Sequence, residues 1–551
     1  MPPSPLPSPA APTASTPDSS SAEVSRSHRA LSGAVRTVSG VTLLSRLGGL
    51  AREVLVARIF GDTWIGSAFA AGFAIPNMFR RLLGEGALSA AFIPEYTQAH
   101  KADPAQANRF ASLTVLALCL VTTALAVLIE LGLLVGLFLL PPSPERTLSF
   151  ELIMVMLPFM PLVCVAAILG GMLQVHGRFG PAATGPLILN TFIIVVGLYF
   201  VATNQLGDQR IAFLLGAATV ASGFTQCLWF LRLLRPHITW TRDFAGSGPG
   251  IRRMLRRFIP VLIGMGTLQL NTFVDMLIAM WPIWVGGTIL GVGYPLDGKS
   301  NIIMAAAQRL YQFPLGVFGI AVATAVFPLL SRHADEPDHF RQTLRRGLRL
   351  SFFIGLPASV GLVLVRHDLI DVLYGGRSGF SQPSLDRSAA VLAGFSPGVW
   401  AYSINHVFTR ALYAKGDTQT PMRVAMAMVA FNFTLNCVLM WPLREAGLAW
   451  STSISAIAQC ALLGVLCRRI AGPVVDRDLV TGSVRIVAAA GLMGAGVALC
   501  AALLPVFPGW VGSLLRVAAL CAAGVAAYAG AAAVLGCHEL RWLLHRHGKA
   551  V

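Results

Sequence analysis

The chain has 551 residues, of which 55% are hydrophobic and only 12% are charged, and its mean hydropathy is +0.68. Soluble domains usually carry about 25% charged residues, so a soluble fold of this composition would expose large apolar patches, and the composition favours a membrane protein. The net charge of +17 does not indicate nucleic-acid binding. The basic residues form short clusters between apolar stretches, and no basic stripe alternates with aromatic residues.

The N-terminal tail differs in composition from the rest of the chain. Residues 1–32 are rich in Pro, Ser and Ala and lack the apolar core of a signal peptide, so we expect a disordered tail followed by an apolar segment that is retained as a membrane anchor. The nine cysteines are scattered singly without a CxxC pair, and no HExxH spacing occurs. Disulfides and a structural metal site are therefore not expected.

From residue 36 onward, the sequence contains apolar segments long enough to cross about 30 Å of hydrocarbon. They predict an all-α polytopic membrane protein of about fourteen transmembrane helices. The segments fall near 36–60, 64–94, 109–140, 147–175, 182–203, 211–233, 258–290, 302–331, 345–365, 385–412, 421–443, 446–467, 482–505 and 512–537.

Lys and Arg concentrate in alternate loops, most clearly in 232–257 and 332–349. The positive-inside rule then predicts a protein of the cell inner (cytoplasmic) membrane with both termini cytoplasmic. Residues 236–257 read as a basic cytoplasmic linker, in which GIRRMLRRFIP (250–260) has the pattern of an interfacial helix. Residues 541–551 read as a cytoplasmic tail.

A weak internal repeat connects the two halves. Arg80 precedes LLGEGALSAAFIP, and Arg309, roughly six predicted spans later, precedes LYQFPLGVFGIAVATAVFP. An even offset gives both halves the same orientation, so they are related by an axis along the membrane normal and the site is expected at their interface. We therefore predict an N-lobe at 33–235 and a C-lobe at 258–470, with two further spans in 480–540.

Charges inside spans are costly and usually functional. Arg46 and Glu53 differ by seven positions and share one helix face. A guanidinium group is permanently charged and makes paired hydrogen bonds that suit a phosphate or pyrophosphate. Alternatively, the arginines snorkel or pair with carboxylates to hold helices together. Their concentration in three helices favours an anion-binding cavity; the charged residues are Arg46, Arg52, Glu53, Arg80, Arg81, Glu85 and Arg309.

Two further features bear on energy coupling and enzymatic activity. Asp275 lies in the seventh predicted span, where it could couple transport to a cation or a proton or could pair with an arginine.

GYPLDGKS (293–300) matches the phosphate-loop pattern, but Pro295 interrupts it and a membrane span follows, so ATP binding is not expected. Gly298 and Lys299 predict a turn and an interfacial anchor. With no nucleophile–base pair, metal cluster or nucleotide site, the sequence does not indicate an enzyme.

In SRLGGLAREVLVARIFG (45–61), PNMFRRLLGEGALSAAFIPEY (76–96) and QRLYQFPLGVFGIA (308–321) the chain resembles the MurJ (MviN) family of lipid II flippases, within the superfamily of multidrug and oligosaccharidyl-lipid/polysaccharide exporters. The resemblance implies two six-helix lobes in a V shape plus two C-terminal helices. It implies alternating access that flips lipid II, the undecaprenyl-pyrophosphate-linked peptidoglycan precursor, to the periplasmic leaflet for cell-wall synthesis. Cell-wall synthases are the implied protein partners.

The resemblance also implies roles for individual residues. The family's substrate-binding arginines match Arg46, Arg52, Arg80 and Arg309. Its acidic cavity partners match Glu53 and Glu85. The ion-coupling positions match Asp275, Asn432, Asn436 and Thr452, and the lipid-tail groove matches 480–540.

The chain departs from the family pattern at several acids. Many relatives have an acid at the position of Ser67 and acids at the positions of Gln308 and Gln312, and sodium-binding members have an acid at Asn436. These changes make the cavity more positive and leave sodium, a proton or the membrane potential as open sources of energy. The loop 284–300 is longer than usual. The alternatives are a flippase for another undecaprenyl-pyrophosphate-linked polysaccharide and a non-transporting membrane scaffold; an arginine-rich cavity disfavours a cationic-drug exporter.

Overall fold

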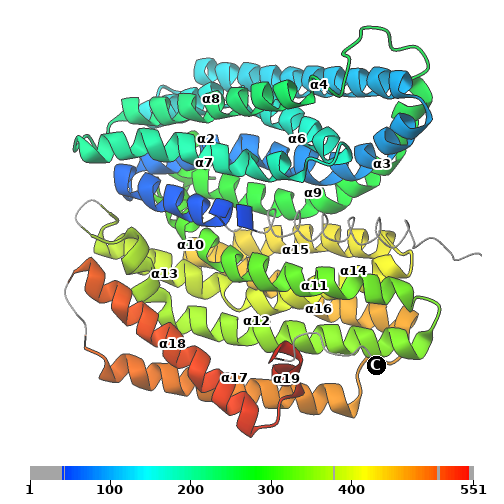
Figure 1. Cartoon of the computed structure of the whole chain (residues 1–551). Coiled ribbons are helices and arrows are strands. Elements are labelled where there is room, and N and C mark those ends of the chain that lie inside the picture. Colours follow the sequence, from blue (N-terminus) through cyan, green and yellow to red (C-terminus); the bar gives the residue numbers. More distant parts are fainter. Residues whose placement is uncertain (1–39, 42–43, 377–378, 506–508, 545–551) are drawn as a thin grey trace, which may run out of the picture.

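The computed structural model describes residues 40–41, 44–376, 379–505 and 509–544. Within them the protein is helical except for one two-stranded hairpin of β1 (Thr288–Ile289) and β2 (Val292–Gly293). The predicted all-α class is confirmed. The helices form two bundles that lie one above the other in Figure 1, with the first helix and α9 between them.

The N-terminal bundle is built around a core of large apolar side chains, among them Phe60, Leu152, Ile153 and Met156, all almost fully buried. A second apolar cluster around Phe92 and Phe230 fills its other end. The bundle consists of a first helix at 44–60, α2 (Trp64–Phe79), η1 (Arg80–Gly86), α3 (Ala87–Ala102), α4 (Pro104–Leu139), α5 (Pro144–Met156), α6 (Phe159–Val175), α7 (Phe179–Ala202) and α8 (Gln209–Leu234).

The C-terminal bundle repeats this pattern. It consists of α10 (Ser300–Pro314), η2 (Leu315–Gly319), α11 (Ile320–Arg332), α12 (Pro337–Tyr374), α13 (Gln382–Phe395), α14 (Gly398–Ala414), α15 (Gln419–Leu443) and α16 (Glu445–Ala471). Two long helices and a short one follow and pack on the outer side of α12 (Figure 1): α17 (Arg477–Leu503), α18 (Trp510–Val534) and α19 (His538–Leu544).

Helix α9 (Gly248–Trp284) connects the bundles. It is a single helix of 37 residues, so the predicted interfacial segment 250–260 continues into the next span without a break. The helix packs against α3 of the N-terminal bundle and against α15 of the C-terminal bundle. Its end is held by Arg146 at the start of α5, whose guanidinium donates to the carbonyl oxygens of Trp284 (2.6 Å) and Val285 (3.3 Å).

Nine helices of the described part are long and apolar enough to cross a membrane. Large apolar side chains cover their outer faces; on α4, for example, Leu128 is 65% and Phe138 is 86% exposed, as expected where lipid replaces water. The other predicted spans carry polar residues or breaks, as the first helix, α2–η1–α3, α9, α10–η2–α11 and α13–α14 do. The count of fourteen therefore stays a prediction.

Both copies of the sequence repeat contain a π-helical turn. Arg80 begins η1, and η2 follows Pro314 five residues after Arg309. Such turns leave the regular hydrogen-bond ladder and occur frequently at functional sites. Here each one lies on the wall between the bundles, beside the predicted arginines.

Candidate substrate cavity

A cavity of about 1560 Å³ lies between the two bundles. The first helix, α2 and α7 line it on one side, α10, η2 and α12 line it on the other, and α9, α17 and α18 complete the wall. Its lining includes five arginines but, among the residues whose side chains are described, only two carboxylates. These charged residues are Arg46, Arg52, Arg80, Arg81, Arg309, Glu53 and Asp275.

Arg52 is buried, with 7% of its surface exposed. Its Nη2 donates to Glu53 Oε1 at 2.6 Å and its Nη1 to Asn190 Oδ1 at 3.0 Å, and its guanidinium carbon lies 4.3 Å from the centre of the Phe73 ring. Asn190 also donates to the carbonyl oxygen of Ser45 at 3.0 Å, which ties α7 to the first helix. Because every side of the guanidinium is supported, it is held in position before any ligand binds.

Glu53 joins the two bundles. Its Oε1 accepts a hydrogen bond from Arg52 and also lies 3.1 Å from Nη2 of Arg309 on α10. One carboxylate therefore serves two guanidinium groups, one from each bundle. The remaining positive charge is the property that an anionic ligand would satisfy.

The other predicted cavity residues line the same space. Arg80 donates from Nε to Asn77 Oδ1 at 3.0 Å. Arg46 lies against η2, where a Cβ at Gly316 would come 2.3 Å from Arg46 Nη1, so glycine gives the guanidinium room. Gln308 and Gln312 also line the cavity. The side chain of Glu85 lies outside the described part of the structure.

Three of the four residues predicted for ion coupling are joined by hydrogen bonds. Asp275 is buried and accepts from Asn436 Nδ2 at 2.7 Å, and the same nitrogen donates to Asn432 Oδ1 at 3.2 Å. Asn436 Oδ1 is buried without a hydrogen-bond partner in the described residues. Thr452 bonds instead to the Leu448 carbonyl of its own helix. The three adjacent side chains offer the hard oxygen ligands that suit an alkali cation, whereas the described residues contain no cluster of three or more His, Cys, Asp or Glu that could hold a metal.

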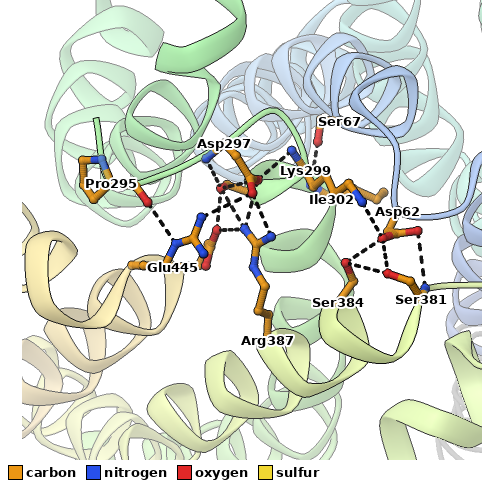
Figure 2. Close-up of polar contacts among 12 residues, drawn as sticks. Asp62, Ser67, Pro295, Asp297, Lys299, Ile302, Ser381, Ser384, Arg387 and Glu445 are labelled. Atoms are coloured by element: carbon orange, nitrogen blue, oxygen red, sulfur yellow. Dashed lines mark hydrogen bonds and ion pairs between the residues drawn. The ribbon is translucent and has the colours of Figure 1, made fainter. Parts of the chain in front are cut away.

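A polar clasp, defined here as Asp62 with Lys299, Ser381 and Ser384, joins the two bundles outside the cavity lining (Figure 2). Asp62 belongs to the N-terminal bundle, and its Oδ2 accepts from Lys299 Nζ at 3.0 Å and from both serine hydroxyls at 2.6 Å. Partial burial alone would raise the pKa of Asp62, but these three donors lower it to about 2. The clasp therefore stays ionised at any ordinary pH.

Ser67, the position at which the family resemblance implied an acid, forms a second joint between the bundles. Its hydroxyl accepts from the backbone N–H of Ile302 at 3.1 Å, and its carbonyl accepts from Asn301 Nδ2 at 2.9 Å. The hydroxyl thus binds one of the N–H groups that have no partner inside α10. A neutral residue suffices for this role.

A network of arginines and carboxylates supports the clasp from the C-terminal bundle (Figure 2). Arg387 makes a paired interaction with Asp297 at 2.8 and 3.0 Å and also bonds Glu445. Arg444 donates to Asp297 at 3.3 Å. These bonds fold residues 293–300 into a turn that places Lys299 against Asp62. The segment begins at the end of an antiparallel hairpin of two-residue strands and its Asp297 is bonded by Arg387 and Arg444, whereas a phosphate loop follows a strand of a βαβ unit and binds an anion.

Sequence reasoning did not identify the clasp or this network. Asp62 lies next to Gly61 at the end of a span, where a charge is ordinarily explained by solvent. Its partners Ser381 and Ser384 are more than 300 positions away, and neither residue type signals a contact. A carboxylate placed directly before an apolar segment was the only available signal.

Comparisons with known proteins show which proteins the chain is similar to. A family model described as lipid II flippase MurJ matches residues 56–518. A probable lipid II flippase MurJ of Vibrio cholerae is 30% identical over 458 residues, which cover 80% of this chain and 83% of that protein. A lipid II flippase MurJ of Burkholderia cenocepacia is 29% identical over 449 residues, covering 78% and 82%.

Solved structures share the fold. A lipid II flippase MurJ in an inward closed conformation superposes with a TM-score of 0.73 at 21% identity, covering 92% of this chain and 99% of that one. An inward-facing multidrug resistance MATE family transporter of the MOP superfamily gives a TM-score of 0.65 at 12% identity, covering 80% and 98%.

Proposed function

Because the chain belongs to the MurJ family of lipid II flippases, we propose that it carries lipid II from the cytoplasmic to the periplasmic leaflet by alternating access. The observation that carries this proposal is the pair of guanidinium groups, Arg52 and Arg309, that share a single carboxylate in the cavity between the bundles. Five arginines line that space, and the one carboxylate between Arg52 and Arg309 already serves both. A diphosphate supplies the missing negative charge in the geometry that guanidinium groups prefer.

Binding of the diphosphate would loosen the link between the bundles. A diphosphate competes with Glu53 for Arg52 and Arg309, and it neutralises the positive charges that repel one another across the cavity. With that repulsion removed, the open end of the cavity can close while the clasp opens. A membrane potential that is positive outside favours outward movement of an anion by about 2.3 kcal/mol per charge per 100 mV.

The apolar tail of the substrate would lie along the C-terminal helices. Met493 and Val497 of α17 and Leu520 and Val525 of α18 line the same cavity as the arginines. Leu362, Val365 and Leu369 of α12 also line this cavity, so the headgroup can stay among the arginines while the polyprenyl chain lies along apolar side chains. This arrangement supports the assignment of 480–540 to the tail groove.

Asp275, Asn432 and Asn436 are our candidates for coupling to sodium or a proton. Asp275 lines the cavity and is hydrogen-bonded to Asn436, which in turn bonds Asn432, and Asn436 Oδ1 has no protein partner in the described residues. Sodium-dependent stabilisation of the wild-type protein that is lost in Asp275→Asn would support a cation site. The absence of any sodium effect would leave a proton or the membrane potential as the driving force.

The protein is a multi-pass protein of the inner membrane. We further propose that both termini are cytoplasmic, as the distribution of Lys and Arg predicts, and that the clasp faces the periplasm. Cell-wall synthases are the candidate protein partners. No observation favours a second function over lipid II flipping.

The decisive experiment measures how much lipid II becomes accessible from outside in cells depleted of their own flippase. Arg52→Ala and Arg309→Ala are each expected to reduce flipping at least tenfold. Arg444→Ala, a matched control outside the cavity, should leave it near the wild-type rate. Normal flipping by both cavity variants would refute the proposal. Rescue of a different polysaccharide pathway, without rescue of lipid II flipping, would identify the other class of lipid-linked substrate.

A further inference from the structure

A second, smaller cavity branches from the main one into the N-terminal bundle. It has a volume of about 220 Å³ and is enclosed by η1, α6, α7 and α8. Arg80, Ala182, Pro186 and Leu189 line both cavities. The side cavity therefore adjoins the main one beside Arg80, one of the arginines assigned to the diphosphate.

The lining of the side cavity is unusually polar for the interior of a membrane bundle. Gln226 of α8 is only 8% exposed, and its amide makes no hydrogen bond with another described residue. Gln174 of α6 lines the same space. Because Gln226 lines the side cavity and has no protein partner among the described residues, its amide is available to hydrogen-bond a ligand or water that enters this space.

The backbone is shaped to give the amide of Gln226 room. A Cβ at Gly185 on α7 would lie 2.3 Å from Gln226 Nε2 and 3.1 Å from its Cδ. Any larger residue at this position would displace the amide. Gly185 has an ordinary helical conformation, so the reason for glycine here is space and not backbone freedom.

Size and chemistry restrict what can enter. Pockets that hold a whole small ligand usually measure about 300–1,000 Å³, so 220 Å³ suits one branch of a larger molecule. A carboxamide both donates and accepts hydrogen bonds and carries no charge. The partner that matches two carboxamides beside a guanidinium is a neutral group with hydroxyl or amide functions, attached directly to an anion.

We propose that this side cavity binds the sugar residue next to the diphosphate. Gln226 and Gln174 hydrogen-bond its hydroxyl or acetamido groups, while Arg80 at the entrance holds the adjoining phosphate. The inference rests on the proposed function and adds a headgroup subsite to it. The subsite makes the transporter sensitive to the sugar as well as to the charge and the lipid tail.

The test compares two probes on purified protein in lipid nanodiscs: undecaprenyl pyrophosphate, which has no sugar, and lipid II. Gln226→Leu, which keeps the size of the side chain and removes its hydrogen bonds, is expected to weaken lipid II binding at least fivefold and to change undecaprenyl pyrophosphate binding less than twofold. Gln209→Leu is the matched control, since Gln209 lies on the same helix as Gln226, is exposed and lines neither cavity. Gly185→Ala, which displaces the amide without removing it, should reproduce the same selectivity.

Each other outcome overturns the subsite. Equal weakening of both probes would mean that Gln226 acts by positioning Arg80, and unchanged binding of both would mean that the side cavity holds only water. A failure of the proposed function looks different. In that case wild-type protein would bind undecaprenyl pyrophosphate no better than undecaprenol, which lacks the diphosphate.

Discussion

Cations and carboxylates meet in two regions of the molecule: the central cavity, and the clasp together with the arginine–carboxylate network that supports it. In the clasp and the network together, three cations pair with three carboxylates. The cations are Lys299, Arg387 and Arg444, and the carboxylates are Asp62, Asp297 and Glu445. In the cavity, five arginines face two carboxylates among the side chains described. Balanced charges hold segments of protein together, whereas an unbalanced set is stable only where a ligand or water completes it. The described contacts show the difference directly: Glu53 is shared by Arg52 and Arg309, whereas Arg387 alone bonds the two carboxylates Asp297 and Glu445.

The two regions also differ in what each cation contacts. Arg387 bonds two carboxylates and a serine hydroxyl, all from protein. Arg52 has one carboxylate, one amide and an aromatic face. Removing a network cation should therefore affect folding, whereas changing a cavity charge should affect the ligand.

The largest effect on stability is expected for Arg387→Ala. Glu445 is only 2% exposed, and the substitution leaves its charge buried without a cation, which costs roughly 3 kcal/mol. Thermal unfolding of the purified protein in detergent measures the loss. Arg444→Ala is the control; Arg444 is about half exposed and should contribute less than about 1 kcal/mol. Equal unfolding temperatures for the two variants would contradict the expectation that the buried ion pair contributes more stability than the exposed one.

A smaller effect, on binding instead of folding, is expected for Glu53→Gln. The substitution keeps the shape of the side chain but removes the carboxylate that Arg52 and Arg309 share. Undecaprenyl pyrophosphate should then bind about fivefold more tightly, which corresponds to about 1 kcal/mol, and flipping should slow because release becomes harder. Asp335→Asn, which changes an exposed carboxylate outside the cavity, should alter neither quantity. Weaker binding by Glu53→Gln would show that the carboxylate organises the arginines more than it competes with the ligand.

The smallest effect concerns the pH dependence of the clasp. The pKa of Asp62 is lowered to about 2 from an ordinary value near 4, so its stabilising contribution is fully present above about pH 4 and is lost as the pH falls towards 2. The difference in unfolding temperature between wild type and Asp62→Asn should therefore stay constant from pH 8 to 5 and shrink below 4. Lys299→Ala should cost less than about 1 kcal/mol, because its ion pair is half exposed. A difference that changes between pH 8 and 5 would contradict the bonding of Asp62 described here.

The positions of most helices could be predicted from hydropathy, and the arginines of the cavity from their place inside apolar segments. The helix ends differed most where polar residues continue a helix beyond the membrane, as in α9, which begins at Gly248 although span seven was expected from 258. Asp275 and Asn436 could be paired only through the family resemblance, and Thr452, predicted with them, bonds within its own helix.

The sequence by itself determined that lipid surrounds the protein, that the protein is helical and that positive charges, which are energetically costly in a membrane, lie inside the spans. Lipid offers no hydrogen bonds to the backbone, so an apolar chain of this length can cross a membrane only as helices or as a closed barrel, and arginine in such a helix must find a partner. Only the tertiary structure decided which partner that is. Glu53 meets Arg309, Asp62 meets Ser381 and Gln226 faces a side cavity because distant helices bring particular faces together, and no local pattern records which faces those are.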